Sequence, residues 1–194
     1  MAKRILFSVC VLIAAAGCPV VSLQPLYNST EELVFKPELV GRWAGDDAGL
    51  EYMEFSQDSS KMYTMTLHEK DNEIRFAVGM VEVKGRLFLD LLPEEPKGDS
   101  AMWLQQMHEF WSIDLNKDTL AVKRMSGDWT GDRSEKGRLW VRHEIIDDKT
   151  ILTAKPDRLK RFVRKWVDDP DAFAEAFTLH RVPSPPDDAK PSQQ

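Results

Sequence analysis

The sequence predicts a mainly β protein, in which an antiparallel up-and-down meander of eight to ten strands closes into a small barrel. One C-terminal amphipathic helix and a last short strand follow the meander. From Leu50 to Ala154 hydrophobic and polar residues mostly alternate, as in half-buried strands. Short polar turns separate these runs, and connections this short join antiparallel neighbours. Barrel closure removes the exposed edges of such a sheet, whereas a two-layer sandwich is the alternative that the pattern leaves open.

The first residues have the pattern of an export signal. Lys3 and Arg4 precede an apolar run from Ile5 to Ala16. This run is too short to cross a bilayer, because a spanning helix takes about 20 residues. The pattern therefore predicts a secretory signal peptide over residues 1–17.

The residues Ala15-Ala16-Gly17-Cys18 resemble the lipobox of bacterial lipoproteins. The resemblance implies cleavage before Cys18, acylation of Cys18 with palmitate, and the lipid membrane as a partner. Pro19 rather than aspartate follows the cysteine, which in that class implies the outer membrane of a Gram-negative cell, with the domain facing the periplasm. The alternative is ordinary cleavage after Ala16, which would leave Cys18 as a free thiol.

The composition limits what the folded domain can be. Cys10 lies inside the predicted signal peptide, so the domain has no disulfide and must be held by its core. Six tryptophans and nine phenylalanines supply the bulk for one domain. The formal charge is −6, and it becomes −8 once Lys3 and Arg4 are removed. That balance argues against nucleic acid as a partner and gives no net attraction to anionic headgroups.

The segment before the first strand is expected to be a tether. Pro19 to Tyr27 contains two prolines and no clear period, which is typical of a linker. Ser29 and Glu32 then have the spacing of a capping box, so either one helical turn or further linker precedes Pro37. The predicted organisation is therefore a lipidated cysteine and tether over 18–36, a barrel domain over 37–182, and a disordered polar tail over 183–194.

The first strand is expected to begin at Gly41-Arg42-Trp43. Trp43 is a structural anchor whose large ring would form part of the core, and Gly41 lets the backbone pass closely. Gly79, within the apolar run of Phe76 to Met80, indicates a bend or bulge. Longer connections are expected at Pro93 to Met107 and at Gly127 to Gly137.

The barrel interior is the candidate ligand site. Its candidate lining residues come from three alternating runs and one run that is apolar on both faces: Tyr63, Met65, Leu67, Phe76, Leu89 and Trp111.

Residues Pro156 to Asp168 predict the amphipathic helix. Leu159, Phe162, Val163, Trp166 and Val167 lie on one stripe, and the opposite side is basic. Such a stripe is expected to pack on the outside of the barrel. The alternative is that the helix lies on a membrane.

The order of strands, helix and final strand, with Gly41-Arg42-Trp43 at the first strand, resembles the lipocalin pattern. More narrowly, it is similar to uncharacterised bacterial lipoproteins with lipocalin-like domains. The family's Thr-Asp-Tyr signature is absent. The family also has a late arginine that stacks on its tryptophan, and Arg124, Arg142 and Arg181 are the candidates here. The resemblance implies a barrel that binds an apolar or amphipathic small molecule.

No motif for chemistry is present. The histidines share no metal-ligand spacing, and there is no nucleophile elbow or phosphate-binding glycine loop. Asp90 and Glu54 are expected to be ordinary exposed carboxylates, and the alternative is that either one is an inward polar group in a cavity. The sequence thus predicts no catalytic residue, metal or cofactor, and a binding protein rather than an enzyme. The main alternative is a non-enzymatic envelope interaction or assembly protein that has a filled barrel and acts through its loops; the oligomeric state stays open.

Overall fold

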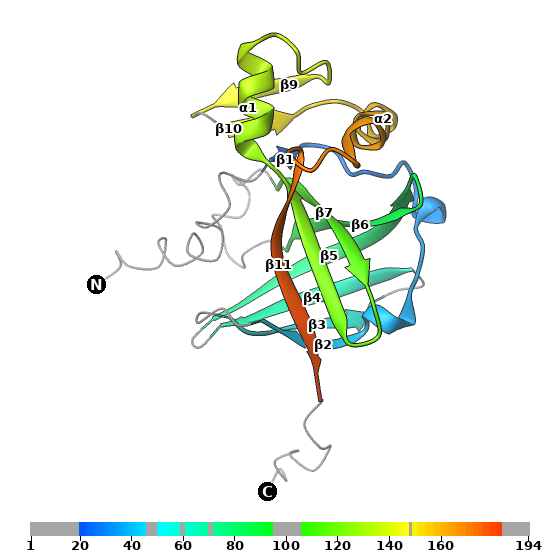
Figure 1. Cartoon of the computed structure of the whole chain (residues 1–194). Coiled ribbons are helices and arrows are strands. Elements are labelled where there is room, and N and C mark those ends of the chain that lie inside the picture. The colour runs from blue at the N-terminus through cyan, green and yellow to red at the C-terminus, as the bar shows by residue number, and fades with distance from the viewer. Residues whose placement is uncertain are drawn as a thin grey trace, which may run out of the picture.

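The computed structural model describes residues 20–45, 50–58, 61–69, 72–94, 106–147 and 149–183. Its centre is a closed antiparallel barrel of eight strands (Figure 1). These strands are β2 (Gly41–Ala44), β3 (Leu50–Gln57), β4 (Met62–Glu69), β5 (Asn72–Val83), β6 (Arg86–Pro93), β7 (His108–Leu115), β8 (Thr119–Met125) and β11 (Phe173–Val182). β2 to β8 pair in chain order, and β11 pairs with both β8 and β2. The predicted small barrel is confirmed, and the sandwich is excluded.

The chain between β8 and β11 forms a second layer, here called the cap (residues 126–172), which lies at the top of Figure 1. It consists of α1 (Gly127–Glu135), the hairpin of β9 (His143–Ile146) and β10 (Lys149–Leu152), and α2 (Pro156–Trp166). The prediction of a loop from Gly127 to Gly137 is wrong. Ser126 caps α1 by accepting a hydrogen bond from the Trp129 N–H at 3.2 Å.

Two separate hydrophobic cores result from this layering. The first fills the barrel, and its largest fully buried side chains include Trp43, Phe55 and Tyr63. The second, the outer core, lies between the outer face of the barrel and the cap, and it contains Phe88 and Phe162. The strands β5 and β6 therefore bury both of their faces along part of their length, which is why their sequence is apolar at successive positions.

α2 is a structural helix, as predicted. Leu159, Phe162 and Val163 are fully buried in the outer core, where Val81 and Val83 of β5 also lie. Burial of this stripe leaves only the basic side of α2 in solvent. The alternative in which the stripe enters a membrane is wrong.

The interpretation of Pro19 to Tyr27 as a linker is wrong from Val20 onward. The short strand β1 (Val21–Ser22) pairs in parallel with β10 and antiparallel with β7. Leu26 and Leu33 are fully buried in the outer core. The domain predicted to begin at residue 37 therefore includes the preceding segment, which fixes barrel and cap to each other. We call residues 20–36 the N-terminal strap.

The predicted turn before Pro37 exists, without its predicted cap. η1 (Thr30–Glu32) is a single 3₁₀ turn, and the Ser29 side chain makes no capping hydrogen bond. A second such turn, η2 (Pro37–Leu39), leads into β2. Glu32 instead accepts hydrogen bonds from Asn28, which holds this part of the strap together.

Gly79 is explained by packing rather than by a bulge. The register of β5 with β4 and β6 runs through Gly79 without interruption. A Cβ atom there would lie 2.9 Å from Cε1 of Tyr27 and 3.0 Å from Cδ2 of Leu33. The missing side chain makes room for the strap, so the predicted bend is wrong.

Several predictions lie outside the described residues: the signal peptide, Cys18, the tail after Pro183, and residues 95–105 of the long connection before β7. Within the described part of the chain, no helix has both the length and the apolar character needed to cross a membrane.

Candidate ligand-binding site in the barrel

The base of the barrel is closed around Trp43, which is completely buried. Its indole N–H donates to the Leu39 carbonyl oxygen at 2.8 Å. The Arg181 guanidinium lies 4.2 Å from the centre of the Trp43 ring, and its Nη1 donates to the Val40 carbonyl oxygen at 3.0 Å. Of the three candidate arginines, Arg181 is therefore the one that stacks on this tryptophan, and it joins the last strand to the first.

Gly41 is required by this arrangement. Its φ of +127° is a backbone conformation that residues with a side chain rarely adopt. A Cβ atom at this position would also lie 2.7 Å from Nη1 of Arg181. The prediction that Gly41 allows a close approach is confirmed, and the group that approaches is the guanidinium.

The end of the strap closes the base. Phe35 stacks on Tyr63 with ring centres 4.9 Å apart. The Tyr63 hydroxyl accepts from the Lys36 N–H at 2.6 Å and is 3.2 Å from the Lys36 carbonyl oxygen, to which it donates. Burial raises the pKa of Tyr63, so the hydroxyl keeps the proton that this second bond needs.

All six predicted lining residues belong to the core inside the barrel. Tyr63, Met65, Leu89 and Trp111 are buried, whereas Leu67 and Phe76 are partly exposed. Partly exposed inward-facing residues lie at both ends of the barrel: Leu87 and Leu115 near the base, and Leu67, Phe76 and Phe177 toward the opposite end. The end opposite the base, here called the mouth, carries these inward-facing residues: Leu67, Phe76, Glu109, Trp111, Arg124 and Phe177.

Two charged residues of the mouth face the interior. Arg124 is the pairing partner of Trp111, and partners in an antiparallel pair project to the same face. Glu109 precedes Trp111 by two residues and projects to that face too. Arg124 is only 8% exposed, and its Nε donates to Oε1 of Glu109 at 2.5 Å.

Two N–H donors of the mouth have no partner. Nη2 of Arg124 and Nε1 of Trp111 are buried, and neither meets a hydrogen-bond acceptor among the described residues. The Trp111 ring is held edge-to-face against Phe177, with centres 5.5 Å apart. Buried donors without partners are rare and unfavourable, so they indicate a place for an acceptor that the described residues do not supply.

The mouth can therefore bind a molecule that is apolar at one end and carries an acceptor oxygen at the other. Glu109 balances the charge of Arg124, so the site favours hydrogen bonding rather than strong net attraction to an anion. Sequence reasoning missed Arg124 as an interior residue. The signal was the alternation of Leu120, Val122 and Arg124, which places all three on one face.

Asp90 is buried, contrary to the prediction of an exposed carboxylate; it is 1% exposed and faces the outer core. Its Oδ2 accepts from the Leu26 N–H at 2.5 Å, and its Oδ1 lies 2.5 Å from Nδ1 of His108. The carboxylate thus fixes the strap to β6 and β7. Glu54, by contrast, is partly exposed and pairs with Arg42 at 2.9 Å, as expected of a surface carboxylate.

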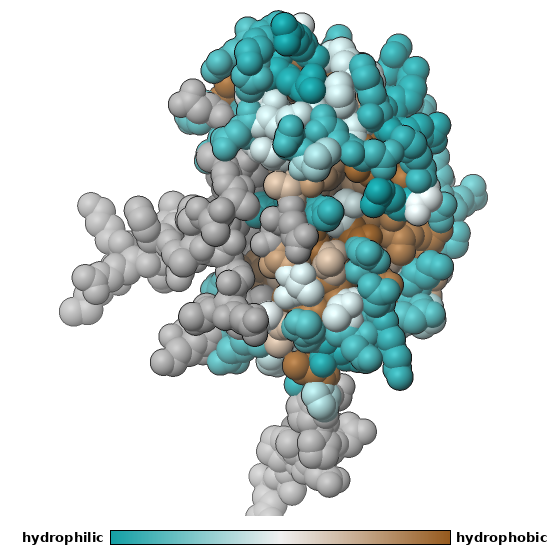
Figure 2. Space-filling view, viewed as in Figure 1, coloured by the Kyte–Doolittle hydropathy of each residue, from teal (hydrophilic) through white to brown (hydrophobic). Residues whose placement is uncertain are grey.

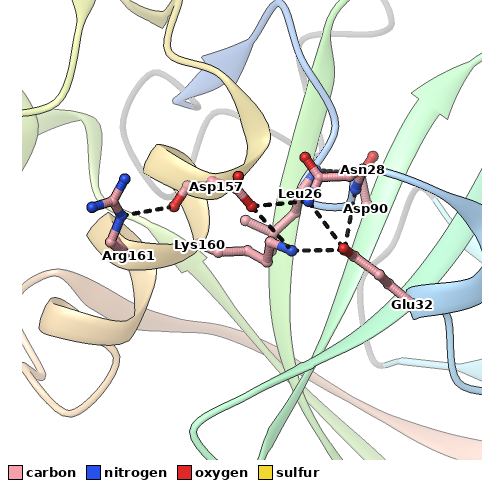
Figure 3. A network of polar contacts seen from close by, with 7 residues as sticks. All are labelled: Leu26, Asn28, Glu32, Asp90, Asp157, Lys160 and Arg161. Carbon is pink, nitrogen blue, oxygen red and sulfur yellow. Dashed lines mark hydrogen bonds and ion pairs between the residues drawn. The ribbon is translucent and has the colours of Figure 1, made fainter.

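A polar network joins the strap to α2 (Figure 3). Glu32 accepts from Nζ of Lys160 at 2.6 Å, and Asn28 donates to Oδ1 of Asp157 at 2.9 Å. The hydrogen bonds from Asn28 and Lys160 lower the pKa of Glu32 to about 2. Figure 3 shows both strap residues reaching the first turns of α2.

One serine and one histidine are close enough to resemble a nucleophile and its base. Nδ1 of His143 lies 2.8 Å from the Val141 carbonyl oxygen and must carry the proton, so Nε2 accepts from the Ser134 hydroxyl at 2.7 Å. Ser134 lies in the last turn of α1, where the helix dipole opposes a developing negative charge.

The described residues contain no group of histidine, cysteine and acidic side chains that could hold a metal ion.

The comparisons with known proteins add no relative: no protein-family model, curated protein or solved structure matches this chain.

Proposed function

We propose that the chain is an envelope-anchored lipoprotein whose barrel binds an amphipathic small molecule at its mouth. The observation that carries the proposal is the pair of unpartnered N–H donors, on Trp111 and Arg124, within an otherwise apolar interior. The apolar part of the ligand would contact Leu67, Phe76 and Phe177. Its polar end, a carboxylate or an ester, would accept from the two donors.

The division of the barrel into a filled base and a less buried mouth supports a ligand of limited depth. At the base, Trp43, Phe55 and Tyr63 are fully buried, although Leu87 and Leu115 beside them are partly exposed. Barrels of about eight strands either fill their interior or hold one small ligand. This barrel would be filled with side chains at the base and would hold a ligand at the mouth.

The ligand proposal is tested with a fluorescent acyl probe, 11-(dansylamino)undecanoic acid. Trp111→Phe removes one donor and keeps an aromatic ring, so affinity is expected to fall by roughly 2- to 10-fold, the value of one hydrogen bond. Trp140→Phe, a change at an exposed tryptophan of the cap, is the matched control and should leave affinity unchanged. Equal affinity in all three proteins would contradict binding at the mouth.

A second variant tests Arg124 without leaving a buried charge unpaired. Glu109→Gln with Arg124→Gln replaces the ion pair by a neutral amide pair. The affinity for the probe is expected to fall by about 10-fold or more in this double variant. Native mass spectrometry of the protein as purified from its own cells would then show whether a small molecule accompanies the wild type and is lost from this double variant.

The anchor is tested separately by labelling cells with radioactive palmitate. The wild-type chain should incorporate label, and Cys18→Ser should not incorporate it and should leave the membrane fraction. Density-gradient fractionation would then test the outer membrane as the location. Labelling of the Cys18→Ser chain would contradict acylation at that residue.

The alternative is an interaction protein that acts through its surface. Trp140, Ile145 and Ile146 are large apolar residues that the cap leaves exposed, which favours this possibility. Under this alternative the acyl probe would not bind at all. Trp140→Ser would instead release a protein partner that co-purifies with the wild type.

A further inference from the structure

One stretch of the cap concentrates positive charge, although the cap as a whole has 11 basic and 10 acidic residues. Residues 138–165 contain nine lysines and arginines and four acidic residues, although the whole chain carries −6. Figure 2 shows hydrophilic side chains covering the cap at the top of the view and hydrophobic ones gathered lower down, toward the barrel. The net charge of the chain therefore does not describe the potential near the cap, which is where an anion would be attracted.

Part of this charge lines a cleft of about 350 Å³ between the β9–β10 hairpin and the start of α2. Its polar and aromatic lining residues are Trp140, Arg142, Thr153, Lys155 and Arg158. We call it the cap cleft.

The cations of the cap cleft are free to bind. Arg142, Lys155 and Arg158 are exposed, and none forms an ion pair or a side-chain hydrogen bond with a described residue. Elsewhere in the cap, Arg133 and Lys160 are paired with carboxylates. Other cations of the cap are exposed and also form no ion pair with a described residue, among them Arg138, Lys149 and Arg164. Three unpaired cations around one cleft thus form a site for an anion that the described chain does not fill.

Two further groups suit a phosphate. The Thr153 hydroxyl oxygen is buried and has no hydrogen-bond partner among the described residues. The first turn of α2 begins at the cleft, with Lys155 as its N-cap, so the positive end of the helix dipole lies there. The N–H groups of Arg158 and Leu159 already donate to the Lys155 carbonyl oxygen, so this turn contributes through its dipole rather than through free donors. Trp140, 44% exposed at the rim, has the ring type that is enriched where a protein meets the headgroup region.

The position of the cleft in the fold bears on whether the phosphate belongs to a lipid bilayer or to a soluble molecule. β1 pairs in parallel with β10, with Val21 opposite Ile151, so the chain before Val21 leads toward Lys149, whereas the cleft lies past the other end of β10 at Thr153. Val21 is three residues beyond Cys18, so an acylated Cys18 would lie within about 11 Å of Val21, since an extended residue spans at most about 3.6 Å. A bilayer that holds such an anchor would therefore lie beside the cap, on the side of the β9–β10 turn.

We infer that the cap cleft binds the phosphate groups of an anionic phospholipid surface. The choice of a bilayer rather than a soluble phosphate rests on the anchor proposed above. The cleft and its unpaired cations are observed independently of that anchor. The contact is electrostatic and superficial, because the apolar stripe of α2 is already buried against the barrel.

The test uses the chain without residues 1–17 and with Cys18→Ser, which retains every described residue and has no lipid. Flotation with vesicles of phosphatidylcholine and phosphatidylglycerol (7:3) should show binding in low salt, and pure phosphatidylcholine vesicles should show little. Each basic residue near an anionic bilayer strengthens binding by about fivefold, so the triple variant Arg142→Gln, Lys155→Gln, Arg158→Gln should bind roughly 100-fold more weakly. The control replaces the same number of exposed lysines away from the cap: Lys36→Gln, Lys117→Gln, Lys123→Gln.

The outcomes separate the possibilities. Loss of binding in the cap variant alone, with unchanged circular dichroism, supports the inference. Equal weakening in the cap variant and the control would overturn it, and so would equal binding to both kinds of vesicle. Saturable binding of inorganic phosphate that needs the three cations, without vesicle binding, would overturn the bilayer as the source. The test is independent of acylation, so a failed palmitate experiment and a failed flotation experiment are distinguishable.

Discussion

At the scale of single residues, the base of the barrel depends on the side chains of Trp43 and Arg181 and on two backbone positions, Leu39 and Gly41. Trp43 is buried because Leu39 satisfies its N–H and Arg181 covers its face. Arg181 in turn needs space above residue 41, which only glycine leaves. The Arg181 guanidinium therefore packs across the Gly-x-Trp triplet, and both the glycine and the tryptophan are needed for that packing.

This arrangement predicts opposite effects for two glycine substitutions. Gly41→Ala must adopt a strained backbone and displace Arg181, so it should destabilise the fold by about 1–3 kcal/mol. Gly131→Ala, in the middle of α1, meets nothing within 4 Å and should stabilise by about 0.5–1 kcal/mol. Urea denaturation measures both. A stable Gly41→Ala protein would contradict the role given to Arg181.

At the scale of elements, α2 and the strap hold the cap on the barrel in different ways. α2 contributes a buried apolar stripe, and the strap contributes both apolar side chains and the polar network around Glu32. The first contribution is large and insensitive to pH. The second is smaller and changes with protonation.

Two substitutions on α2 separate its faces. Phe162→Asp places a charge in the outer core and should unfold the protein. Arg164→Asp, on the exposed side of the same helix, should shift the melting temperature by no more than a few degrees. If Phe162→Asp melts like the wild type, the packing of α2 described above is wrong.

The network around Glu32 predicts a stability that depends on pH. The pKa of Glu32 is lowered to about 2 from an ordinary value of 4.5, so its carboxylate stabilises the fold above about pH 4.5. That contribution is lost as the pH falls toward 2. Because the Glu32 side chain is 37% exposed, the effect should not exceed about 1 kcal/mol.

Melting curves at pH 6 and pH 2 check this expectation. Glu32→Gln should be less stable than the wild type at pH 6, and the difference should shrink at pH 2. Glu82→Gln, at an exposed position on β5, should match the wild type at both values. A constant difference between wild type and Glu32→Gln at the two values would count against the ionic part of the network.

At the scale of the whole molecule, Asp90 is where barrel, strap and outer core meet. Asp90→Ala would leave the Leu26 N–H without its acceptor and remove the partner of His108 inside a buried region. The expected cost is about 3–5 kcal/mol. Glu54→Ala, which breaks a surface pair on β3, should cost about 1 kcal/mol or less. Urea denaturation followed by tryptophan fluorescence and by far-UV circular dichroism should show one transition, since the strap couples both cores.

The sequence was sufficient for the barrel because strands with one buried face alternate. Five of the six interior residues follow directly from that period, and Phe76 comes from a run that is apolar on both faces. The sequence was insufficient where a second core covers the outer face. There Asp90 is buried, although its position in the alternation places it on the outward face of the barrel. Gly79 leaves room for side chains of the strap on that same face. The strap itself has prolines and no period, because its contacts with barrel and cap are irregular. α1 was missed because Trp129 is its only large apolar residue.

The seam of the barrel bears on how the protein is made. β11 occupies the place between β8 and β2, and no earlier strand can substitute for it. While the ribosome is still producing β11, β2 has only β3 as a neighbour, and the apolar interior stays open to water. Closure joins segments more than a hundred residues apart, as in Arg181 with Val40, and such distant pairings form slowly. The nascent chain is thus expected to stay unsealed and prone to aggregation until β11 emerges, and to need a chaperone during that interval.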